Sequence, residues 1–210
     1  MARPLPRAFF ARPTVEVARD LLGCRLHRVV DGVARVARVV ETEAYCGVED
    51  LACHASKGLT ARTAPMFGPA GHAYVYFVYG MHHCLNAVTE GGRGAAVLVR
   101  ALEPLSGIPE GCKTSGPGLL TKAMSVDRTL DAHDLTRGET LWLEAGEGPA
   151  GAVETGPRIG VDYAGEWAGR PWRFWLADSP WVSARPRRGG RGVVQGGPVR
   201  RPASAGRRGR

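Results

Sequence analysis

The sequence predicts a single α+β domain built on an antiparallel β-sheet with a few short helices. At 210 residues, 44% of them hydrophobic, the chain suits one domain with a substantial core. Segments with the alternation typical of β-strands outnumber those with helical spacing. An Asp31-Gly32 pair separates two such segments, and this pair is a strong signal for a hairpin of antiparallel strands.

The first expected elements are one helix and one hairpin. Residues 14–22 place apolar side chains at helical spacing, with Thr14 as the candidate N-cap and Gly23 as the end of the helix. Residues 24–30 and 33–45 are expected to form the two strands of the hairpin. The helix carries no side chain that suggests chemistry, so we expect it only to pack.

Two carboxylates lie on the second strand of this hairpin. Alternation places Glu41, Glu43 and Tyr45 on one face of the strand, together with Val39. Two acidic side chains beside a tyrosine are unusual for a strand that only builds a core. A solvated edge strand is the simpler alternative, and alternation alone does not distinguish the roles of Glu41 and Glu43.

Tyrosines are concentrated in one part of the chain. Four of the five lie within residues 41–86, and a core strand rarely needs so many rings that carry hydroxyl groups. A site that binds a flat ligand with polar edges does need them. Residues 46–73 form a long irregular segment that contains His54, and loops of this length are usually functional. A histidine taken alone, however, is more often structural than catalytic.

A second hairpin is expected directly after this segment. Residues 74–79 are predicted to form a strand and 83–89 the return strand, with a turn at Gly80-Met81. The strand pattern puts Tyr74 and Tyr76 on one face, whereas Tyr79 is expected to project from the tip. A flat ring on a protruding tip suits a wedge between base pairs, and an ordinary surface tyrosine is the alternative.

Arg100 interrupts the apolar run of the next predicted strand, residues 95–102. A buried arginine needs an anionic partner, and a carboxylate of the Glu41–Tyr45 strand is the obvious candidate. The pair is either purely structural or a means of keeping a carboxylate ionised for catalysis. The remaining elements are expected to be short: a helix over 119–124 and strands over 141–143 and 173–176.

The positive charge of the chain is confined to its last residues. The formal net charge is +8, but residues 185–210 hold nine arginines and no acidic residue. The 28 basic residues less these nine leave 19 against 20 acidic ones, so residues 1–184 have a net charge of −1. We expect 1–184 to be the catalytic domain and 185–210 a disordered basic tail, which either binds phosphates or is dispensable.

The sequence predicts a cytoplasmic protein, associated with the nucleoid if it is bacterial. No run of 18 apolar residues and no signal-peptide pattern is present. The five cysteines form no C-x-x-C pair, which indicates reduced thiols. Cys53, His54 and Cys84 with the neighbouring histidines match no usual zinc spacing, so neither a metal nor another cofactor is expected.

Five runs of sequence, occurring in the expected order, resemble the alkyladenine (3-methyladenine) DNA glycosylase family. The match extends from about residue 8 to about residue 183. It implies a curved antiparallel sheet with short helices, a fold that is 3-methyladenine DNA glycosylase-like and similar to the C-terminal domain of formyltransferases. The runs are Glu41 to Tyr45, Met66 to Gly68, Tyr74 to Met81, Arg100 to Pro104 and Arg158 to Trp167.

The resemblance implies an enzyme that removes alkylated or deaminated purines from double-stranded DNA in base excision repair. Glu43 is the implied general base, Arg100 orients the carboxylate and the water, and the main-chain carbonyl of Ile159 contacts the water. Tyr79 and Met81 are the implied residues that enter the DNA where the base is flipped out. The residues implied to form the base pocket are Tyr45, His54, Tyr76 and Asn86.

No position in the family calls for a catalytic lysine, so we expect a monofunctional enzyme. We also expect the enzyme to act as a monomer. Lys57 is the nearest lysine to the motifs and lies in the long irregular segment. The chain departs from the family at Leu119, where a lysine usually follows Gly-Pro-Gly, and this affects expected contacts to the DNA backbone.

Two other functions compete with the DNA glycosylase. A catalytically silent nucleic-acid-binding module of the same fold would be favoured if Glu43 or Arg100 were missing, and both are present. A glycosidase acting on sugars needs two carboxylates that flank a cleft, and Glu41 and Glu43 on one strand face do not flank anything.

Overall fold

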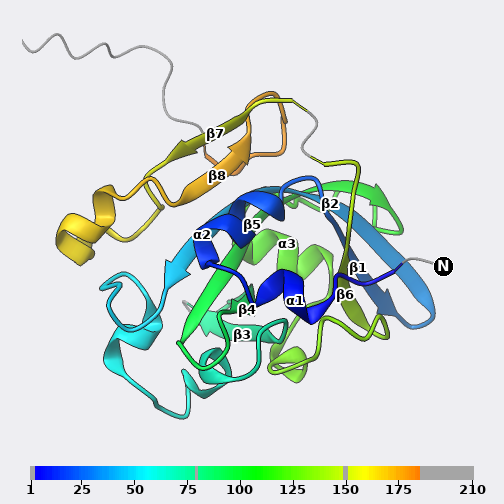
Figure 1. The fold of residues 1–210 in the computed structure, drawn as a ribbon. Helices are drawn as coiled ribbons and strands as arrows, with labels where there is room; N and C mark the ends of the chain where they lie inside the picture. Colours follow the sequence, from blue (N-terminus) through cyan, green and yellow to red (C-terminus); the bar gives the residue numbers. More distant parts are fainter. Residues whose placement is uncertain (1–2, 79, 149–150, 185–210) are drawn as a thin grey trace, which may run out of the picture.

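The computed structural model describes residues 3–78, 80–148 and 151–184. In this part of the chain an antiparallel sheet curls around the molecule, with short helices packed against it (Figure 1). This confirms the α+β class predicted from the sequence. The strands are β1 Arg25–Val30, β2 Val33–Cys46, β3 Ala73–Val78, β4 His82–Thr89, β5 Ala95–Ser106, β6 Leu141–Glu144, β7 Val153–Gly156 and β8 Arg173–Leu176.

The helices are all short. The α-helices are α1 Arg7–Phe10, α2 Thr14–Asp20 and α3 Pro117–Ala123, and the 3-10 helices are η1 His54–Lys57, η2 Ala64–Phe67, η3 Arg128–Leu130 and η4 Asp162–Gly169. Within the described residues, each helix falls short of the length and apolarity needed to traverse a bilayer.

Strand β2 is the centre of the sheet. The strand order is β3-β4-β5-β2-β1-β6, and β8 pairs with both β2 and β7. The first part of β2 pairs with β1, and residues 41–43 pair with β5 on one side and β8 on the other. Register shifts between Val39 and Thr42 disturb the β2–β5 ladder, and such bulges bend a strand. The residues that carry the two acids are therefore buried between two neighbouring strands.

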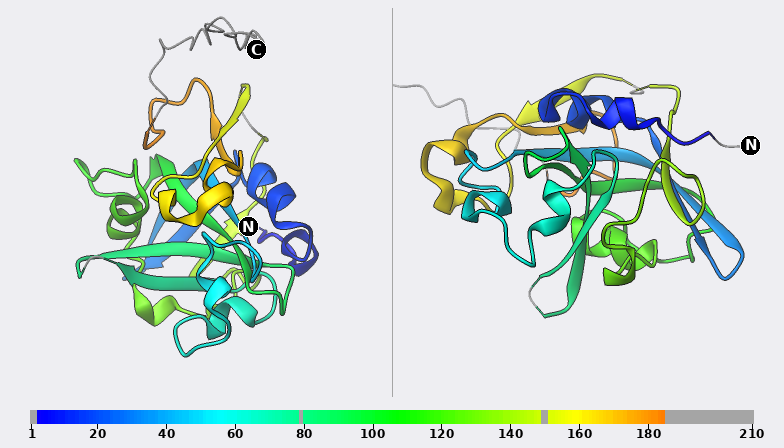
Figure 2. Two further views of the ribbon diagram at one scale, coloured as in Figure 1. Left: turned by 90° about the vertical axis from the view of Figure 1, so that its left-hand side faces the viewer. Right: turned by 60° about the horizontal axis from the view of Figure 1, so that its bottom comes forward.

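The two faces of the sheet have different roles. Helices α1 and α2 lie over one face and α3 over the other, as the two further views show (Figure 2). Thr42 of β2 donates its hydroxyl to the carbonyl of Ala18 in α2, so it faces the helices. Glu41 and Glu43 point to the opposite face, as the alternation in the sequence predicts.

The expected hairpins are present, but the start of α2 and two short additional elements differ from expectation. Asp31 and Gly32 both have positive φ, of 49° and 78°, as a tight two-residue hairpin requires. Thr14 is not an N-cap; it is buried, and its hydroxyl donates to the carboxylate of Glu90. The structure adds α1 and β7, which have too few residues to show a periodic pattern in the sequence.

The turn between β4 and β5 supports the long irregular segment through a glycine. Gly94 has a φ of +71°, and a Cβ there would lie 2.7 Å from the Cβ of Ala55 and 2.9 Å from the ring of Phe67. Gly92, in the same turn, has a φ of +83° but open space around it. A comparison of Gly94 with Gly92 therefore separates the effect of backbone strain from the effect of steric overlap.

We predict that Gly94→Ala lowers the free energy of unfolding more than Gly92→Ala does. Both substitutions force an L-residue into the left-handed region, at roughly 1–2 kcal/mol. Gly94→Ala also overpacks the contact with Ala55 and Phe67, which adds about 1–3 kcal/mol. Urea unfolding of the two variants measures the difference, and equal losses would contradict the contact described here.

Candidate active site

A cavity of about 400 Å³ opens on the face of the sheet away from α1 and α2. Its walls come from the end of β2, from β3, β4 and β5, from η1 and η4, and from the start of α3. All four side chains expected in the base pocket line it, and so do two of the three expected around the water. These six residues are Tyr45, His54, Tyr76, Asn86, Arg100 and Ile159.

Aromatic rings form one wall of the cavity. The ring centroids of His54 and Tyr76 lie 4.6 Å apart with an interplanar angle of 72°, and those of Tyr74 and Tyr76 lie 5.2 Å apart. Nδ1 of His54 is 3.0 Å from the hydroxyl of Tyr74. Strand alternation explains the pairing, because Tyr74 and Tyr76 share one face of β3. The wall is a ready surface for a flat ring.

The wall is uncharged near neutral pH. Burial, helped by the positive charges of Arg62 and Lys57, lowers the pKa of His54 to about 4. Burial also raises the pKa of the Tyr74 hydroxyl to about 12 and raises the pKa of Tyr76 further. His54 is therefore a neutral imidazole, and both tyrosines keep their protons.

Asn86 is fixed on the return strand of the same hairpin. It is buried opposite Tyr74 in the β3–β4 ladder, and its Nδ2 donates to the main-chain carbonyl of Tyr74 at 2.9 Å. A side chain tied to the backbone in this way has little freedom to move aside. Asn86 can therefore obstruct a ligand as well as bind one.

Glu43 lies directly behind the cavity lining, fully buried. Its Oε1 accepts the main-chain N–H of Ile159 at 2.8 Å and lies 3.3 Å from NH1 of Arg100. Its Oε2 accepts the hydroxyl of Tyr45 at 2.9 Å. Burial raises the pKa of Glu43, and these three contacts oppose that rise. The carboxylate is thus held by groups that themselves line the cavity.

Glu41 has the same burial but different partners. Its Oε1 accepts hydrogen bonds from Nε of Arg100 at 3.1 Å and from Nε of Arg173 at 2.7 Å. Its Oε2 accepts a hydrogen bond from the main-chain N–H of Ser183 at 2.6 Å. Arg173 also donates to the carbonyl of Ala184. These contacts join β2 to β5, to β8 and to the segment after β8. Of the three partners only Arg100 lines the cavity, whereas all three partners of Glu43 do, so the contacts of Glu41 mainly hold the strands together.

Arg100 joins the two acids. It is 7% exposed, contacts Glu41 through Nε and Glu43 through NH1, and lines the cavity. The neighbouring carboxylates raise its pKa, although burial opposes them, so it stays protonated. The expectation that Arg100 pairs with a carboxylate of the Glu41–Tyr45 strand is confirmed, and it pairs with two.

The residues expected to enter DNA are only partly described. Tyr79 lies outside the described residues, so nothing in the structure bears on its position. Met81 follows β3 at the turn and is 70% exposed. Leu119, where the family usually has lysine, is 38% exposed on α3. The main-chain N–H of Ile159 donates to Glu43. The family resemblance implied a different role for Ile159, in which its carbonyl contacts the water.

Two features of the site had no part in the sequence analysis. Tyr163, the one tyrosine outside residues 41–86, lines the cavity from η4 and donates its hydroxyl to the carbonyl of Ala52. Arg158 and Asp50 form a buried ion pair beside Tyr45. Both Tyr163 and Arg158 belong to the run from Arg158 to Trp167, so the motif itself was the available signal.

Comparisons with known proteins agree on one family. The family model described as "Methylpurine-DNA glycosylase" matches residues 8–180. A protein of Myxococcus xanthus, provisionally named 3-methyladenine DNA glycosylase, is 56% identical over 184 residues, covering 87% of this chain and 94% of that protein. Proteins with the same name from Methanocella arvoryzae and Legionella pneumophila are 53% and 50% identical, over 86% of this chain and 96% and 98% of theirs.

The cavity has an aromatic wall and a buried carboxylate behind its lining, and this arrangement is suited to a flat ring. The chain belongs to the methylpurine-DNA glycosylase family. It is a hydrolase of the DNA glycosylase class, and DNA with alkylation damage is the substrate of that class. The family predicted from the sequence is therefore confirmed.

We predict that Glu41→Gln destabilises the protein strongly. The substitution removes the negative charge that pairs with the buried guanidinium groups of Arg100 and Arg173. Removing one partner of a buried ion pair costs about 3–5 kcal/mol. Thermal or urea unfolding measures the loss. Glu43→Gln is the matched control, because the amide oxygen of Gln still accepts from Ile159 and its NH2 group can donate to the hydroxyl oxygen of Tyr45. An equal loss in both variants would contradict the separate roles assigned to the two acids.

Proposed function

We propose that this enzyme flips damaged purines out of double-stranded DNA and hydrolyses the N-glycosidic bond with a water activated by Glu43. The substrates are alkylated or deaminated purines: 3-methyladenine, 7-methylguanine, ethenoadenine and hypoxanthine. The observation that carries the proposal is the buried carboxylate of Glu43, held at the cavity wall by Arg100, Tyr45 and the amide of Ile159. One chain supplies every one of these groups, so a monomer acting on chromosomal DNA in the cytoplasm suffices.

Base flipping accounts for the size and the aromatic wall of the cavity. A base inside a duplex is out of reach, and extruding it costs roughly a few kcal/mol. Stacking on an aromatic side chain returns about 1–3 kcal/mol per base. Tyr45, His54 and Tyr76 provide such faces, and an alkylated purine with a positive charge gains cation–π attraction as well. Tyr79 and Met81 fill the space that the extruded nucleotide leaves.

Asn86 makes the pocket selective by obstruction. Because its amide nitrogen is tied to the carbonyl of Tyr74, the side chain does not swing away from an entering base. Guanine carries an exocyclic amino group that adenine and hypoxanthine lack at the same position. Crowding that group disfavours normal guanine without any new attractive contact. 7-Methylguanine carries the same group, and the cation–π attraction of its positive charge offsets the crowding.

Glu43 acts as the general base in its ionised form. Burial disfavours that form and raises the pKa, whereas Arg100, the amide of Ile159 and the hydroxyl of Tyr45 favour it. Activity therefore rises as the pH increases through the raised pKa. Arg100 orients the carboxylate and the water, and the carbonyl of Ile159 accepts a hydrogen bond from the same water.

These contacts also weigh against a silent nucleic-acid-binding module. Glu41 is buried equally, but its oxygens are occupied by contacts that join strands, whereas the partners of Glu43 all line the cavity. A carboxylate whose desolvation costs stability and whose contacts serve the cavity supports hydrolysis over binding alone.

We predict that Glu43→Gln abolishes base release and leaves lesion binding intact. Gln fills the same space but does not accept a proton from water, so a loss of at least about 10²-fold is expected. Single-turnover release from duplexes with hypoxanthine or ethenoadenine, and from methylated DNA, measures the rate, with gel-shift binding alongside. Full activity of Glu43→Gln, or a loss specific to Glu41→Gln, would overturn the assignment.

We predict no covalent intermediate with the abasic product. A bifunctional glycosylase forms a Schiff base through an amine, and no amine is among the groups that line the cavity in the described part of the chain. Borohydride added during turnover should trap no protein–DNA adduct. A known bifunctional glycosylase provides the positive control, and an adduct that disappears in Lys57→Gln would assign the nucleophile instead.

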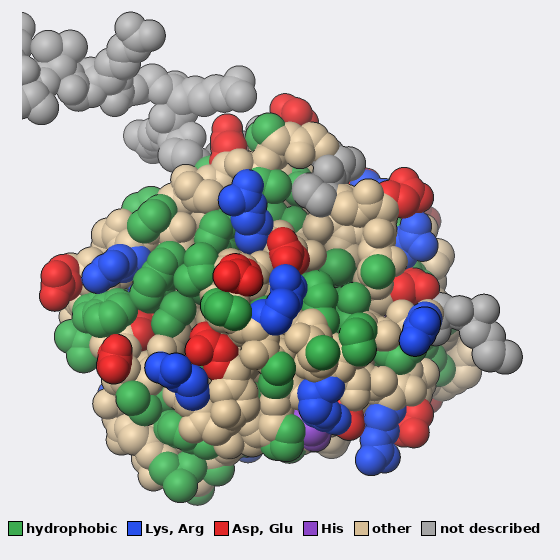
Figure 3. All heavy atoms as spheres, in the orientation of Figure 1, with side chains coloured by type: hydrophobic (Ala, Val, Ile, Leu, Met, Phe, Trp, Pro, Cys, Tyr) green, Lys and Arg blue, Asp and Glu red, His purple; other side chains and the backbone are tan. Residues whose placement is uncertain are grey.

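We propose that residues 185–210 bind the DNA backbone without sequence preference. Residues 1–184 carry almost no net charge, and acidic and basic side chains alternate over the face shown in Figure 3. Changing the nine arginines to glutamine should reduce the salt dependence of binding, by a slope of about 0.9 for each phosphate that the arginines neutralise in the parent. An unchanged slope of log Kd against log salt would show that the extension is dispensable for binding.

A further inference from the structure

Arg158 is the most heavily engaged side chain outside the residues already given a role. It is 4% exposed and forms a two-pronged pair with Asp50, NH1 to Oδ2 at 2.5 Å and NH2 to Oδ1 at 2.9 Å. It also donates to the carbonyl of Ala44 at 2.9 Å and to that of Trp167 at 3.2 Å. One guanidinium therefore connects the end of β2, the loop after it and η4.

Aromatic rings enclose the same guanidinium. Its central carbon lies 4.8 Å from the ring centroid of Tyr45 and 5.1 Å from that of Trp172. Nε of Arg158 is buried and has no hydrogen-bond partner among the described residues. A buried, unsatisfied N–H costs stability, and the contacts of NH1 and NH2 offset that cost. The site gives a further reason for an arginine here.

That reason is the position of Glu43. Two of its hydrogen bonds come from the hydroxyl of Tyr45 and the N–H of Ile159. Arg158 packs on the ring of Tyr45, holds the carbonyl of Ala44 just before it, and directly precedes Ile159 in the chain. Both neutral donors to the carboxylate therefore depend on where Arg158 lies.

We propose that Arg158, locked by Asp50, is a positioning residue that sets the geometry and the ionisation of Glu43 through Tyr45 and Ile159. Arg158 is not among the residues that line the cavity, and its hydrogen bonds go to Ala44, Asp50 and Trp167 and not to Glu43. The inference rests on the proposed role of Glu43 as general base. It adds that the pair Asp50–Arg158, whose members are 108 residues apart in the chain, is required for the hydrolytic step.

The proposal predicts a change in pH dependence. Hydrogen bonds from Ile159 and Tyr45 favour the ionised form of Glu43, so weakening them lets burial raise its pKa further. The acidic limb of the pH–rate profile then moves to higher pH. The charged or titratable groups that face Glu43 are Arg100, Tyr45, Glu41, Tyr76, Cys84 and Arg158 itself.

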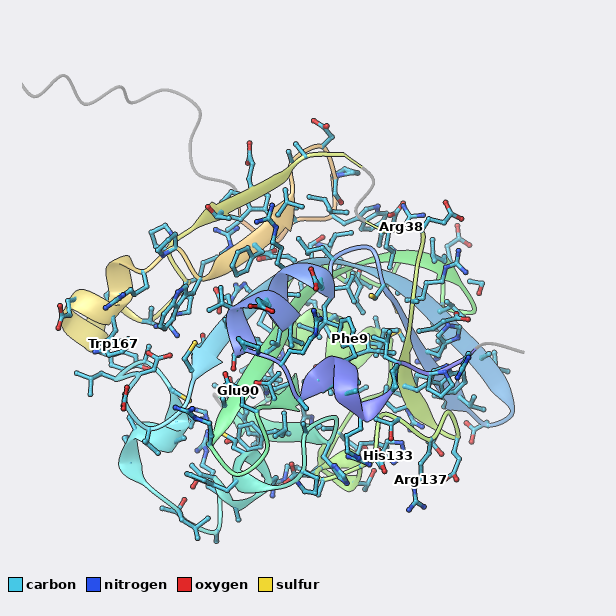
Figure 4. The ribbon with its side chains drawn as sticks, viewed as in Figure 1. Phe9, Arg38, Glu90, His133, Arg137 and Trp167 are labelled. Carbon is cyan, nitrogen blue, oxygen red and sulfur yellow. The ribbon has the colours of Figure 1, made fainter. Side chains whose placement is uncertain are left out.

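Arg158→Lys is the informative variant, because it keeps the positive charge and removes the planar two-pronged contact. Arg38→Lys is the matched control: Arg38 pairs with Glu103 at 3.0 Å on the β2–β5 ladder. Figure 4 shows Arg38 and Trp167 at opposite ends of the molecule, so the control leaves the site alone. Single-turnover release of hypoxanthine is measured from about pH 5 to about pH 9, with lesion affinity and melting temperature.

Arg158→Lys should slow base release at neutral pH at least about tenfold, move the acidic limb to higher pH, and change lesion affinity less than the rate. Arg38→Lys should match the parent in all three. The proposal would be overturned if the rate fell while the acidic limb of the pH–rate profile stayed in place. It would also be overturned if the loss in rate equalled the loss of folded protein. If Arg158→Lys does not fold, Asp50→Glu carries the same expectations, because it keeps the charge and displaces the two-pronged contact. A parent that releases no base would instead refute the proposed function itself.

Discussion

The site depends on a buried cluster of two carboxylates and two guanidinium groups. Glu41 and Glu43 come from β2, Arg100 from β5 and Arg173 from β8. Taking these charges out of water is costly, and the cost is offset only while all four remain in contact. The cluster therefore requires the three strands to stay in register where β2 has neighbours on both sides.

The contacts of Glu41 and Glu43 differ because their neighbours differ, and not because of their own positions on β2. Alternation gives Glu41 and Glu43 the same face, and both are fully buried. Glu41 meets Ser183 and Arg173, which are 142 and 132 residues further along the chain, and these contacts occupy both of its oxygens. Glu43 meets groups that line the cavity. No local pattern in the sequence contains this distinction, so alternation left the choice open and only the family resemblance favoured Glu43.

Elements that depend on local chemistry were predictable, and those that depend on distant contacts were not. The turn at Asp31-Gly32 and the shared face of Tyr74 and Tyr76 follow from the backbone preferences and the two-residue period of a strand. The pair of Asp50 and Arg158 forms across 108 residues, and nothing near either residue indicates it. The side chains predicted for the pocket line one cavity, whereas the pair that supports two of its neighbours was not predicted.

The electrostatics of the cavity suit a base that carries positive charge. A protonated imidazole in the wall would repel such a base, and burial with the nearby charge of Arg62 keeps His54 neutral at any pH well above its pKa of about 4. Arg100 is the cation in contact with Glu43, and both of its acidic partners already neutralise it. The cavity thus has neutral rings on its aromatic wall and the carboxylate of Glu43 behind its lining, an arrangement that suits a cationic purine. The charges that hold the fold together are arranged so that they do not oppose the substrate.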